Sequence, residues 1–171
     1  MPDIDQTWPG EFEFCPYCGG PLGDQTVGGR IRKTCPVCRW VHFRNPAVGV
    51  AGVVIDDARL LLVKRGPTAT RSGLWCIPCG FLDYGEEVRA GAAREVVEET
   101  GLEVEVGRVL WVASNFHDPA KLTVGIWFDA TVVGGELRAG DDAVEAGFFP
   151  LDDLPDLAFE TDAELIASLT R

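Results

Sequence analysis

The sequence lacks any hydrophobic run long enough to cross a membrane. Its longest apolar stretch, residues 47–55, is short and glycine-rich, whereas a spanning helix needs about 20 apolar residues. The first residues also lack the basic and then apolar pattern of a signal peptide. We therefore expect a cytoplasmic protein with no membrane partner. The 171 residues, 46% hydrophobic, are enough for one core and at most a small accessory module.

Positive charge is also scarce: the sequence has 15 Lys and Arg residues but 27 Asp and Glu residues, which gives a net charge of −12. Residues 1–45 hold five basic and five acidic side chains, so residues 46–171 carry the whole excess. Such a surface repels phosphate backbones, and we expect no general binding of nucleic acid. A phosphate-bearing small molecule would need a cation to bridge it to this protein, which favours a divalent metal.

Four of the six cysteines form two pairs with the spacing Cys15-x2-Cys18 and Cys35-x2-Cys38. This spacing is typical of a structural zinc ribbon, in which four thiolates close the coordination shell. Disulfides are the alternative, but an intracellular chain keeps its thiols reduced. Arg39 stands where a glycine often follows the second pair. Composition changes at Pro46, so we expect a zinc ribbon over residues 1–45 and a larger domain over residues 46–171.

Cys76 and Cys79 form a third pair of this spacing, for which a redox or metal-binding role must be considered. In an extended strand the two side chains would point to opposite faces and lie about 10 Å apart, beyond the reach of a disulfide. We interpret both as small core residues.

The larger domain begins with two expected strands at residues 47–55 and 59–65, joined at Asp56-Asp57. A helix is expected from Glu86 to Thr100, ended by Gly101. Further strands are expected at residues 103–113, 121–133 and 144–149, and a last helix over residues 162–169 with Thr161 as its N-cap. This order of elements predicts an α+β domain, a mixed sheet covered by helices.

The helix over residues 86–100 brings three carboxylates together. At about 100° per residue, Glu95, Glu98 and Glu99 fall on one arc, and the alanine and valine residues between them form a separate core face. Their mutual repulsion would be relieved by a hard, oxygen-seeking cation such as Mg²⁺, or Mn²⁺ in its place. Arg94 and Glu86 are placed to orient these groups. The alternative is a solvated acidic helix face.

Residues 80–102 match the pattern G-x5-E-x7-R-E-U-x-E-E-x-G-U, where U is aliphatic, from Gly80 to Leu102. The sequence therefore resembles the Nudix hydrolase family. The resemblance implies the Nudix fold, a mixed sheet sandwiched by helices, and a homodimer. It also implies that the carbonyl of Gly80 joins Glu95, Glu98 and Glu99 around the metal, and that the enzyme hydrolyses a diphosphate bridge.

The ribbon narrows the resemblance to two branches of the family. We call the pattern of residues 80–102 the Nudix box. NADH pyrophosphatases carry the signature S-Q-P-W-P-F-P-x-S after this box, but residues 113–117 read Ala-Ser-Asn-Phe-His here. The sequence more closely resembles the ADP-ribose and FAD pyrophosphatases, which implies release of AMP from ADP-ribose or FAD. Hydrolysis of NADH or NAD is an alternative. A non-catalytic, ligand-sensing Nudix domain is another, although such domains usually have broken boxes.

Several further residues are candidates for contact with the substrate or for the general base. Trp75 and Phe81 flank the start of the box and could stack on a ring, although a core role is the alternative for each. Arg65 ends an expected strand and could bind phosphate. The base could be Glu95, or a loop carboxylate among Asp141, Asp142 and Glu145, of which we favour Glu145.

Overall fold

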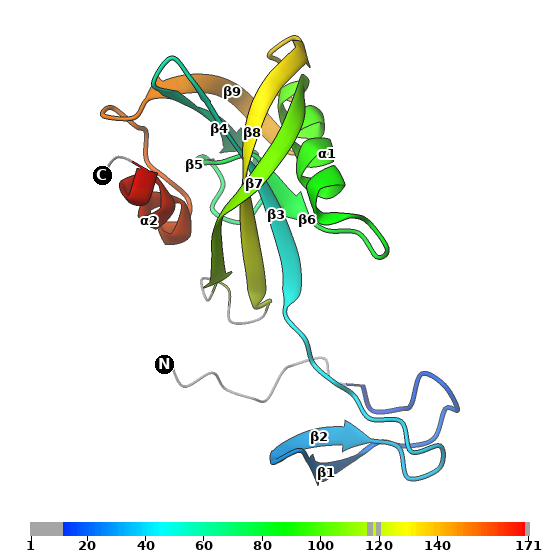
Figure 1. Cartoon of the computed structure of the whole chain (residues 1–171). Helices are drawn as coiled ribbons and strands as arrows, with labels where there is room; N and C mark the ends of the chain where they lie inside the picture. The colour runs from blue at the N-terminus through cyan, green and yellow to red at the C-terminus, as the bar shows by residue number, and fades with distance from the viewer. Residues whose placement is uncertain (1–11, 116–117, 119–120, 170–171) are drawn as a thin grey trace. The chain divides into compact units, whose positions relative to one another are not determined.

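The computed structural model describes residues 12–115, 118 and 121–169, and its chain divides into two compact units, Met1–Pro46 and Ala47–Arg171 (Figure 1). The first unit contains β1 (Gly23–Val27) and β2 (Arg30–Thr34), paired as an antiparallel hairpin. The second unit contains all the other elements. Neither described helix has the length and apolar character needed to cross a bilayer.

In the first unit two tight turns carry the cysteine pairs. The Gly19 N–H donates to Cys15 O and the Arg39 N–H donates to Cys35 O, both at 2.9 Å. Gly19 has φ 71°, and Arg39 adopts φ 65° at the matching position. A side chain in this left-handed region costs about 1 kcal/mol, so the second turn is held despite the residue that occupies it.

The second unit is built on a mixed sheet in the order β5-β4-β3-β8-β7. Its members on this path are β3 (Ala47–Asp56), β4 (Arg59–Arg65), β5 (Trp75–Cys76), β7 (Leu102–Asn115) and β8 (Thr123–Gly135). Short β6 (Cys79–Phe81) also pairs with β3, and β9 (Ala143–Pro150) pairs with β4. Only the β3–β8 pairing is parallel among the pairings of the described strands.

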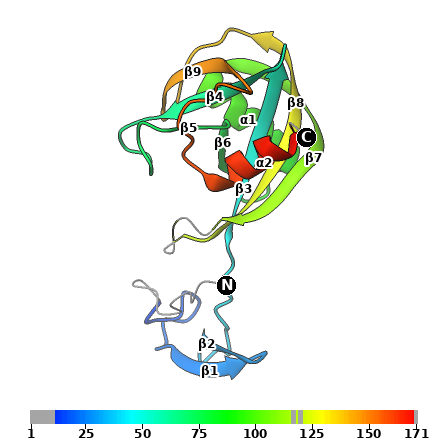
Figure 2. The same ribbon diagram turned by 90° about the vertical axis from the view of Figure 1, so that its left-hand side faces the viewer.

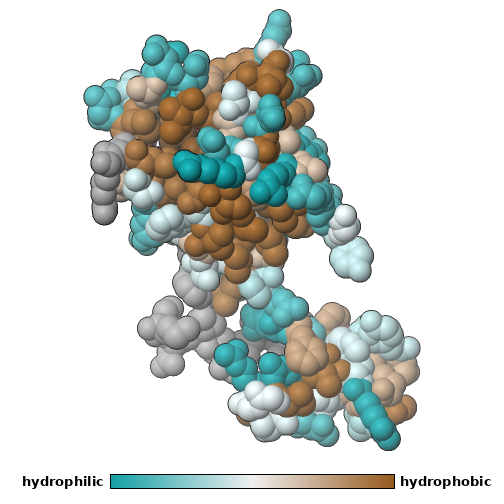
Figure 3. Space-filling model, viewed as in Figure 1, coloured by the Kyte–Doolittle hydropathy of each residue, from teal (hydrophilic) through white to brown (hydrophobic). Residues whose placement is uncertain are grey.

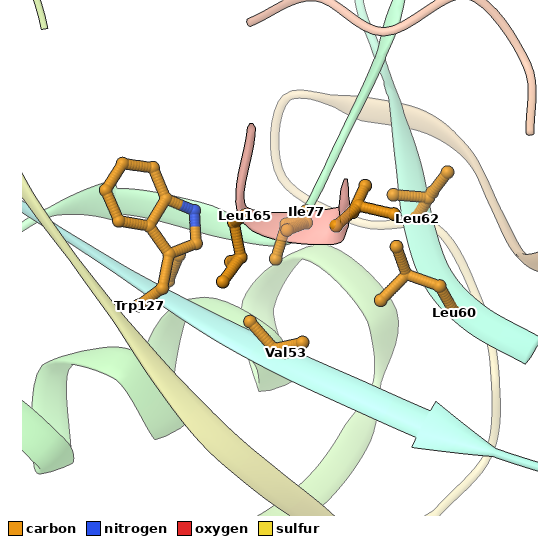
Figure 4. Packing of buried hydrophobic residues seen from close by; sticks show 8 residues of the cluster. Val53, Leu60, Leu62, Ile77, Trp127 and Leu165 are labelled. Atoms are coloured by element: carbon orange, nitrogen blue, oxygen red, sulfur yellow. The ribbon is translucent and has the colours of Figure 1, made fainter. Parts of the chain in front are cut away.

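Two helices cover opposite faces of this sheet: α1 (Val88–Thr100) lies on one side and α2 (Glu160–Leu169) on the other (Figures 1 and 2). The mixed sheet between helices confirms the expected fold class. Between the sheet and α2 lies a core of buried side chains, six of which are labelled in Figure 4: Val53, Leu60, Leu62, Ile77, Trp127 and Leu165.

Local signals placed most boundaries correctly, and the structure corrects four details. The hairpin turn is at Asp57 and Ala58, both with positive φ, rather than at Asp56-Asp57. Helix α1 begins at Val88 rather than Glu86, because the Glu87 carboxylate caps it by accepting from the N–H groups of residues 89 and 90. Helix α2 begins at Glu160, so Thr161 lies inside it and is not its N-cap.

The fourth correction concerns Cys76 and Cys79. The strand expected through both residues is interrupted at Ile77-Pro78, so Cys76 ends β5 and Cys79 begins β6. The expectation that they point apart is therefore wrong: the thiols are hydrogen-bonding neighbours, and this contact together with burial raises the pKa of Cys79. Both thiols are free. Cys76 is fully buried and Cys79 is partly exposed.

Strand β7 lies at the end of the sheet path and carries apolar side chains on its surface. Val109 and Val112 are 44% and 59% exposed. In Figure 3, hydrophobic residues gather where the lower part of β7 faces the viewer in Figure 1. An edge strand with such residues is a surface on which another chain can pack.

Candidate active site

Arg94 organises carboxylates of α1 and of the segment that precedes it. Its guanidinium donates to both carboxylate oxygens of Glu86 at 2.9 and 3.0 Å, to Glu95 at 2.7 Å and to Glu98 at 2.9 Å. It also donates to the backbone carbonyl of Phe81 at 3.1 Å. These bonds lower the pKa of Glu86 to about 2 and raise the pKa of Arg94. A single cation therefore fixes three carboxylates and the strand that precedes the helix.

Burial of these carboxylates differs from the sequence-based expectation. We expected separate apolar and carboxylate faces on α1, but Glu95 and Glu99 are 7% and 2% exposed, whereas Val97 is 41% exposed. Burial raises the pKa of Glu95 even though Arg94 opposes the shift. Burial and the nearby Cys76 raise the pKa of Glu99 to about 9. Buried carboxylates of this kind are costly to ionise unless a cation neutralises them.

Gly80 of β6 approaches Glu95 more closely than any side chain would permit. A Cβ at position 80 would overlap the Glu95 carboxylate, so any other residue there would displace that carboxylate from its place. The neighbouring Cys79 N–H donates to the Glu99 carboxylate at 2.8 Å. Strand β6 and helix α1 therefore bring the backbone of residues 79–80 and two buried carboxylates into one small region.

The donor set fits a hard divalent cation, because it offers carboxylate oxygens beside the backbone of the half-buried residues 79–80. Glu98 completes the set, since it shares Arg94 with Glu95 and remains accessible to solvent. In the first unit, the sulfur atoms of Cys15, Cys18, Cys35 and Cys38 all lie within 4.8 Å of one another. This arrangement is compatible with a zinc ribbon, and the Cys38 N–H lowers the pKa of the Cys35 thiol to about 6, which favours the metal-binding thiolate.

The structure distinguishes among the three loop carboxylates that the sequence left as alternatives for the general base. The charges of Asp141 and Asp142 act on Glu95 and Glu99 respectively and contribute to their raised pKa values. Glu145 instead lies on β9 and forms an exposed ion pair with Lys64 at 2.7 Å. The loop after β8 therefore brings Asp141 and Asp142 to the carboxylate cluster, although we favoured Glu145 from the sequence. Local spacing gave no signal for this choice, because it depends on how β9 pairs with β4.

A pocket of about 160 Å³ opens beside the cluster and is lined by Gly80 together with residues of β3, β6, β7, β8 and α2. Phe81 and Arg65, two of the residues that the sequence suggested as substrate contacts, line this pocket. Trp75 does not; its ring packs edge-on against Phe149, with centroids 4.6 Å apart, beside the core. No sequence pattern indicated two further polar lining residues, Asn115 and Asp162, since distant strands and α2 bring them together.

Glu99 makes the stability of the metal-free protein depend on pH. Its folded-state pKa of about 9 lies above the ordinary value of 4.5, so its contribution is present in full below about pH 4.5 and is lost as the pH rises through about 9. We expect the thermal unfolding midpoint in magnesium-free buffer to fall over this range, and to fall less in Glu99→Gln. Equal slopes in the two proteins would show that Glu99 ionises normally. Added magnesium should stabilise the wild type most at high pH.

Comparisons with known proteins agree with this geometry. The model of the NUDIX domain family matches residues 44–169. An ADP-ribose pyrophosphatase from Methanocaldococcus jannaschii is 44% identical over 132 residues, which cover 77% of this chain and 78% of that protein. The NAD-capped RNA hydrolase NudC of Stutzerimonas stutzeri is 29% identical over 88% of this chain, but the chain spans only 52% of that relative.

The crystal structure of a NUDIX hydrolase from Nitrosomonas europaea superposes with a TM-score of 0.80 at 30% identity. The match covers 91% of this chain and 88% of that one. The likeness therefore extends over nearly all of both chains.

Proposed function

Since the chain belongs to the NUDIX family of pyrophosphohydrolases, we propose that it hydrolyses the diphosphate bridge of ADP-ribose or FAD with magnesium and releases AMP. The observation that carries this proposal is the cluster of Glu95, Glu98 and Glu99, held by Arg94 beside the backbone of Gly80. The relative that matches over more than three quarters of both lengths is named an ADP-ribose pyrophosphatase, which supports ADP-ribose over NADH.

The residues of this chain would divide the work as follows. The carboxylates of Glu95, Glu98 and Glu99, with the carbonyl of Gly80, would hold Mg²⁺, or Mn²⁺ in its place. When bound, the ion supplies charge neutralisation for the diphosphate oxygens and a lower pKa for the attacking water. Arg94 and Glu86 position the carboxylates. A carboxylate takes the proton from the attacking water, and Glu95, Asp141 and Asp142 are the candidates that lie in or beside the cluster.

Arg65 remains our proposed contact for the substrate phosphates. It lines the pocket, and its guanidinium donates through Nε to Thr70 O at 2.7 Å and lies 5.1 Å from the centre of the Phe159 ring. These contacts, with the hydrogen bond that Nη1 donates to the Cys76 thiol at 3.7 Å, fix the direction of its positive charge at the pocket. Phe81, 46% exposed at the pocket, is proposed to contact a ring of the substrate.

The remaining parts of the proposal rest on the family resemblance and on side-chain chemistry. Zn²⁺ bound by the four clustered cysteines is proposed to be structural, because four thiolates leave no open coordination position. A homodimer is proposed as well, and the exposed valines of β7 support it. The substrate is a small molecule, and general binding of nucleic acid is not part of the proposal.

A substrate panel tests the proposed function. ADP-ribose, FAD, NADH, NAD, a diadenosine polyphosphate and ATP are incubated with the full chain and magnesium, and the products are separated by chromatography. We expect AMP from ADP-ribose or FAD at the highest rates. Faster release of AMP from NADH or NAD would favour the NADH pyrophosphatase branch of the family, in line with the NudC relative. Rapid turnover of ATP without AMP from the dinucleotides would overturn the proposal, and binding of ADP-ribose without turnover would indicate a sensor.

A further inference from the structure

The pocket beside the carboxylate cluster has a floor without side chains. Gly49 of β3 lies directly between Phe81 of β6 and Gly125 of β8, in one row across the sheet. A Cβ at Gly49 would meet only two backbone oxygens, at 3.6 and 4.0 Å, so the strip above it is open. Because side chains alternate between faces along a strand, this strip lies on the face of the sheet that α2 covers (Figure 2).

Two aromatic side chains border the strip. On one side Phe81 lines the pocket, and on the other Trp127 lines it with its indole N–H fixed to Asp162 at 2.9 Å. Gly125 makes room for the Trp127 ring, which a Cβ there would overlap. Strands β6 and β8 are separated by two strand spacings, about 10 Å. A planar ring stacked at about 3.5 Å from each neighbour needs about 7 Å, which this backbone spacing allows. Lys121 Nζ lies 3.7 Å from the centre of the Phe81 ring, so a stacked ring takes the other face of Phe81 or displaces Lys121.

An unsatisfied polar group faces this same region. Asn115 ends β7 and pairs with Thr123 of β8, and its Nδ2 donates to the Thr123 hydroxyl at 3.1 Å. Its Oδ1 is buried and has no hydrogen-bond partner among the residues that the structure describes. A Cβ at Gly125 would lie 3.1 Å from Asn115 Nδ2, so the amide lies against the glycine row. A buried acceptor left unpaired is costly, and an N–H of a bound ligand would satisfy it.

The donor and acceptor pattern favours a ring that carries an amino group. An Asn amide offers an acceptor and a donor side by side, which match the amino group and the adjacent ring nitrogen of adenine or of cytosine. Of these two bases, only adenine occurs in the proposed substrates ADP-ribose and FAD. The pocket also reaches Gly80, beside Glu95, so a nucleoside bound here would place its phosphates at the carboxylate cluster. We propose that Asn115 accepts a hydrogen bond from the 6-amino group of an adenine held above Gly49 between Phe81 and Trp127, and thereby selects adenine nucleotides. This inference rests on the proposed function.

The test compares ADP-ribose with the analogue in which hydrogen replaces the 6-amino group of adenine. We expect the wild type to prefer ADP-ribose by at least about 10-fold in kcat/KM, because the analogue leaves Asn115 Oδ1 unpaired. Asn115→Leu has similar volume and no acceptor. It should lower kcat/KM for ADP-ribose by about 10-fold and leave the analogue within about threefold, so that the preference disappears. Ser114→Ala, the exposed neighbour on the opposite face of β7, should change neither value.

Equal losses for both compounds in Asn115→Leu, or no preference in the wild type, would overturn the proposal. Gly49→Ala provides a second test in case Asn115→Leu does not fold, because the added Cβ meets no atom closer than 3.6 Å. It should keep the unfolding midpoint and raise KM for ADP-ribose with little change in kcat, whereas an unchanged KM would contradict the position of the ring. If the wild type hydrolyses neither compound, the proposed function fails. The Kd values of AMP and of its 6-deamino analogue, measured by calorimetry for the wild type and for Asn115→Leu, then test the role of Asn115 independently of hydrolysis.

Discussion

Glu98→Gln is expected to lower the turnover of ADP-ribose by at least about 10²-fold, the scale of removing a group that stabilises the transition state. The substitution keeps the shape of the side chain and the hydrogen bond from Arg94, but it removes a negative charge from the carboxylate cluster. Glu98 is also the most exposed of the three box carboxylates, so its loss should leave the core packing intact. The measurement is steady-state release of AMP over a range of magnesium concentrations.

Glu105→Gln serves as the matched control, because Glu105 is an exposed carboxylate on β7, outside the box. It makes the same change in net charge and should keep wild-type turnover. The required magnesium concentration should rise in Glu98→Gln and stay constant in the control. Activity of Glu98→Gln within threefold of the wild type would show that the helix α1 carboxylates do not hold the catalytic metal.

Cys15→Ser is expected to remove zinc from the first unit and to unfold it. Four sulfur atoms within 4.8 Å of one another would close the coordination shell of the proposed zinc, and in so small a module the free energy of zinc binding would supply most of the free energy of folding. Zinc content by metal analysis and amide NMR signals of residues 12–46 provide the readouts. The catalytic unit should remain folded and should hydrolyse its substrate at saturating magnesium.

Val37→Ala is the control for this variant, since Val37 is an exposed residue between Cys35 and Cys38 and all four thiols are kept. Brief treatment of the wild type with a mild chelator should abolish hydrolysis while zinc remains bound, and added magnesium should restore the activity. Cys15→Ser with an unchanged unfolding midpoint and no turnover at saturating magnesium would instead place the first unit in the active site.

The sequence predicted the clusters of carboxylates and of cysteines better than it predicted the pocket. The carboxylates of α1, the orienting Arg94 and the cysteine pairs are all local patterns, in which the spacing along one element already determines which side chains meet. The fold class and the order of the longer strands followed from the same local signals. The start of α1 was misplaced by two residues, because adjacent glutamates compete for the N-cap position and only the backbone geometry decides between them.

The pocket proposed to bind the nucleoside could not be predicted from the sequence, because no single element contains it. Phe81, Gly49, Gly125 and Asn115 come from four strands, and their adjacency depends on the register of three strand pairings. A shift of one residue in any of these pairings would turn a lining residue to the other face. The burial of Glu99 likewise depends on the break at Ile77-Pro78, which places the Cys79 N–H against its carboxylate.

The alternation along β3 has a consequence for how such a protein can evolve. Val50 packs with Ala92 of α1, while a Cβ at its neighbour Gly49 would enter the open strip of the pocket. Contacts to the helix that carries the box carboxylates and contacts to the proposed base-recognition surface therefore alternate along the same strand. We expect mutations on the Gly49 side to affect which nucleobase is accepted more than they affect the packing of α1. A lineage, or a laboratory library restricted to one face, could thus acquire new substrate preferences while its catalytic ability is preserved.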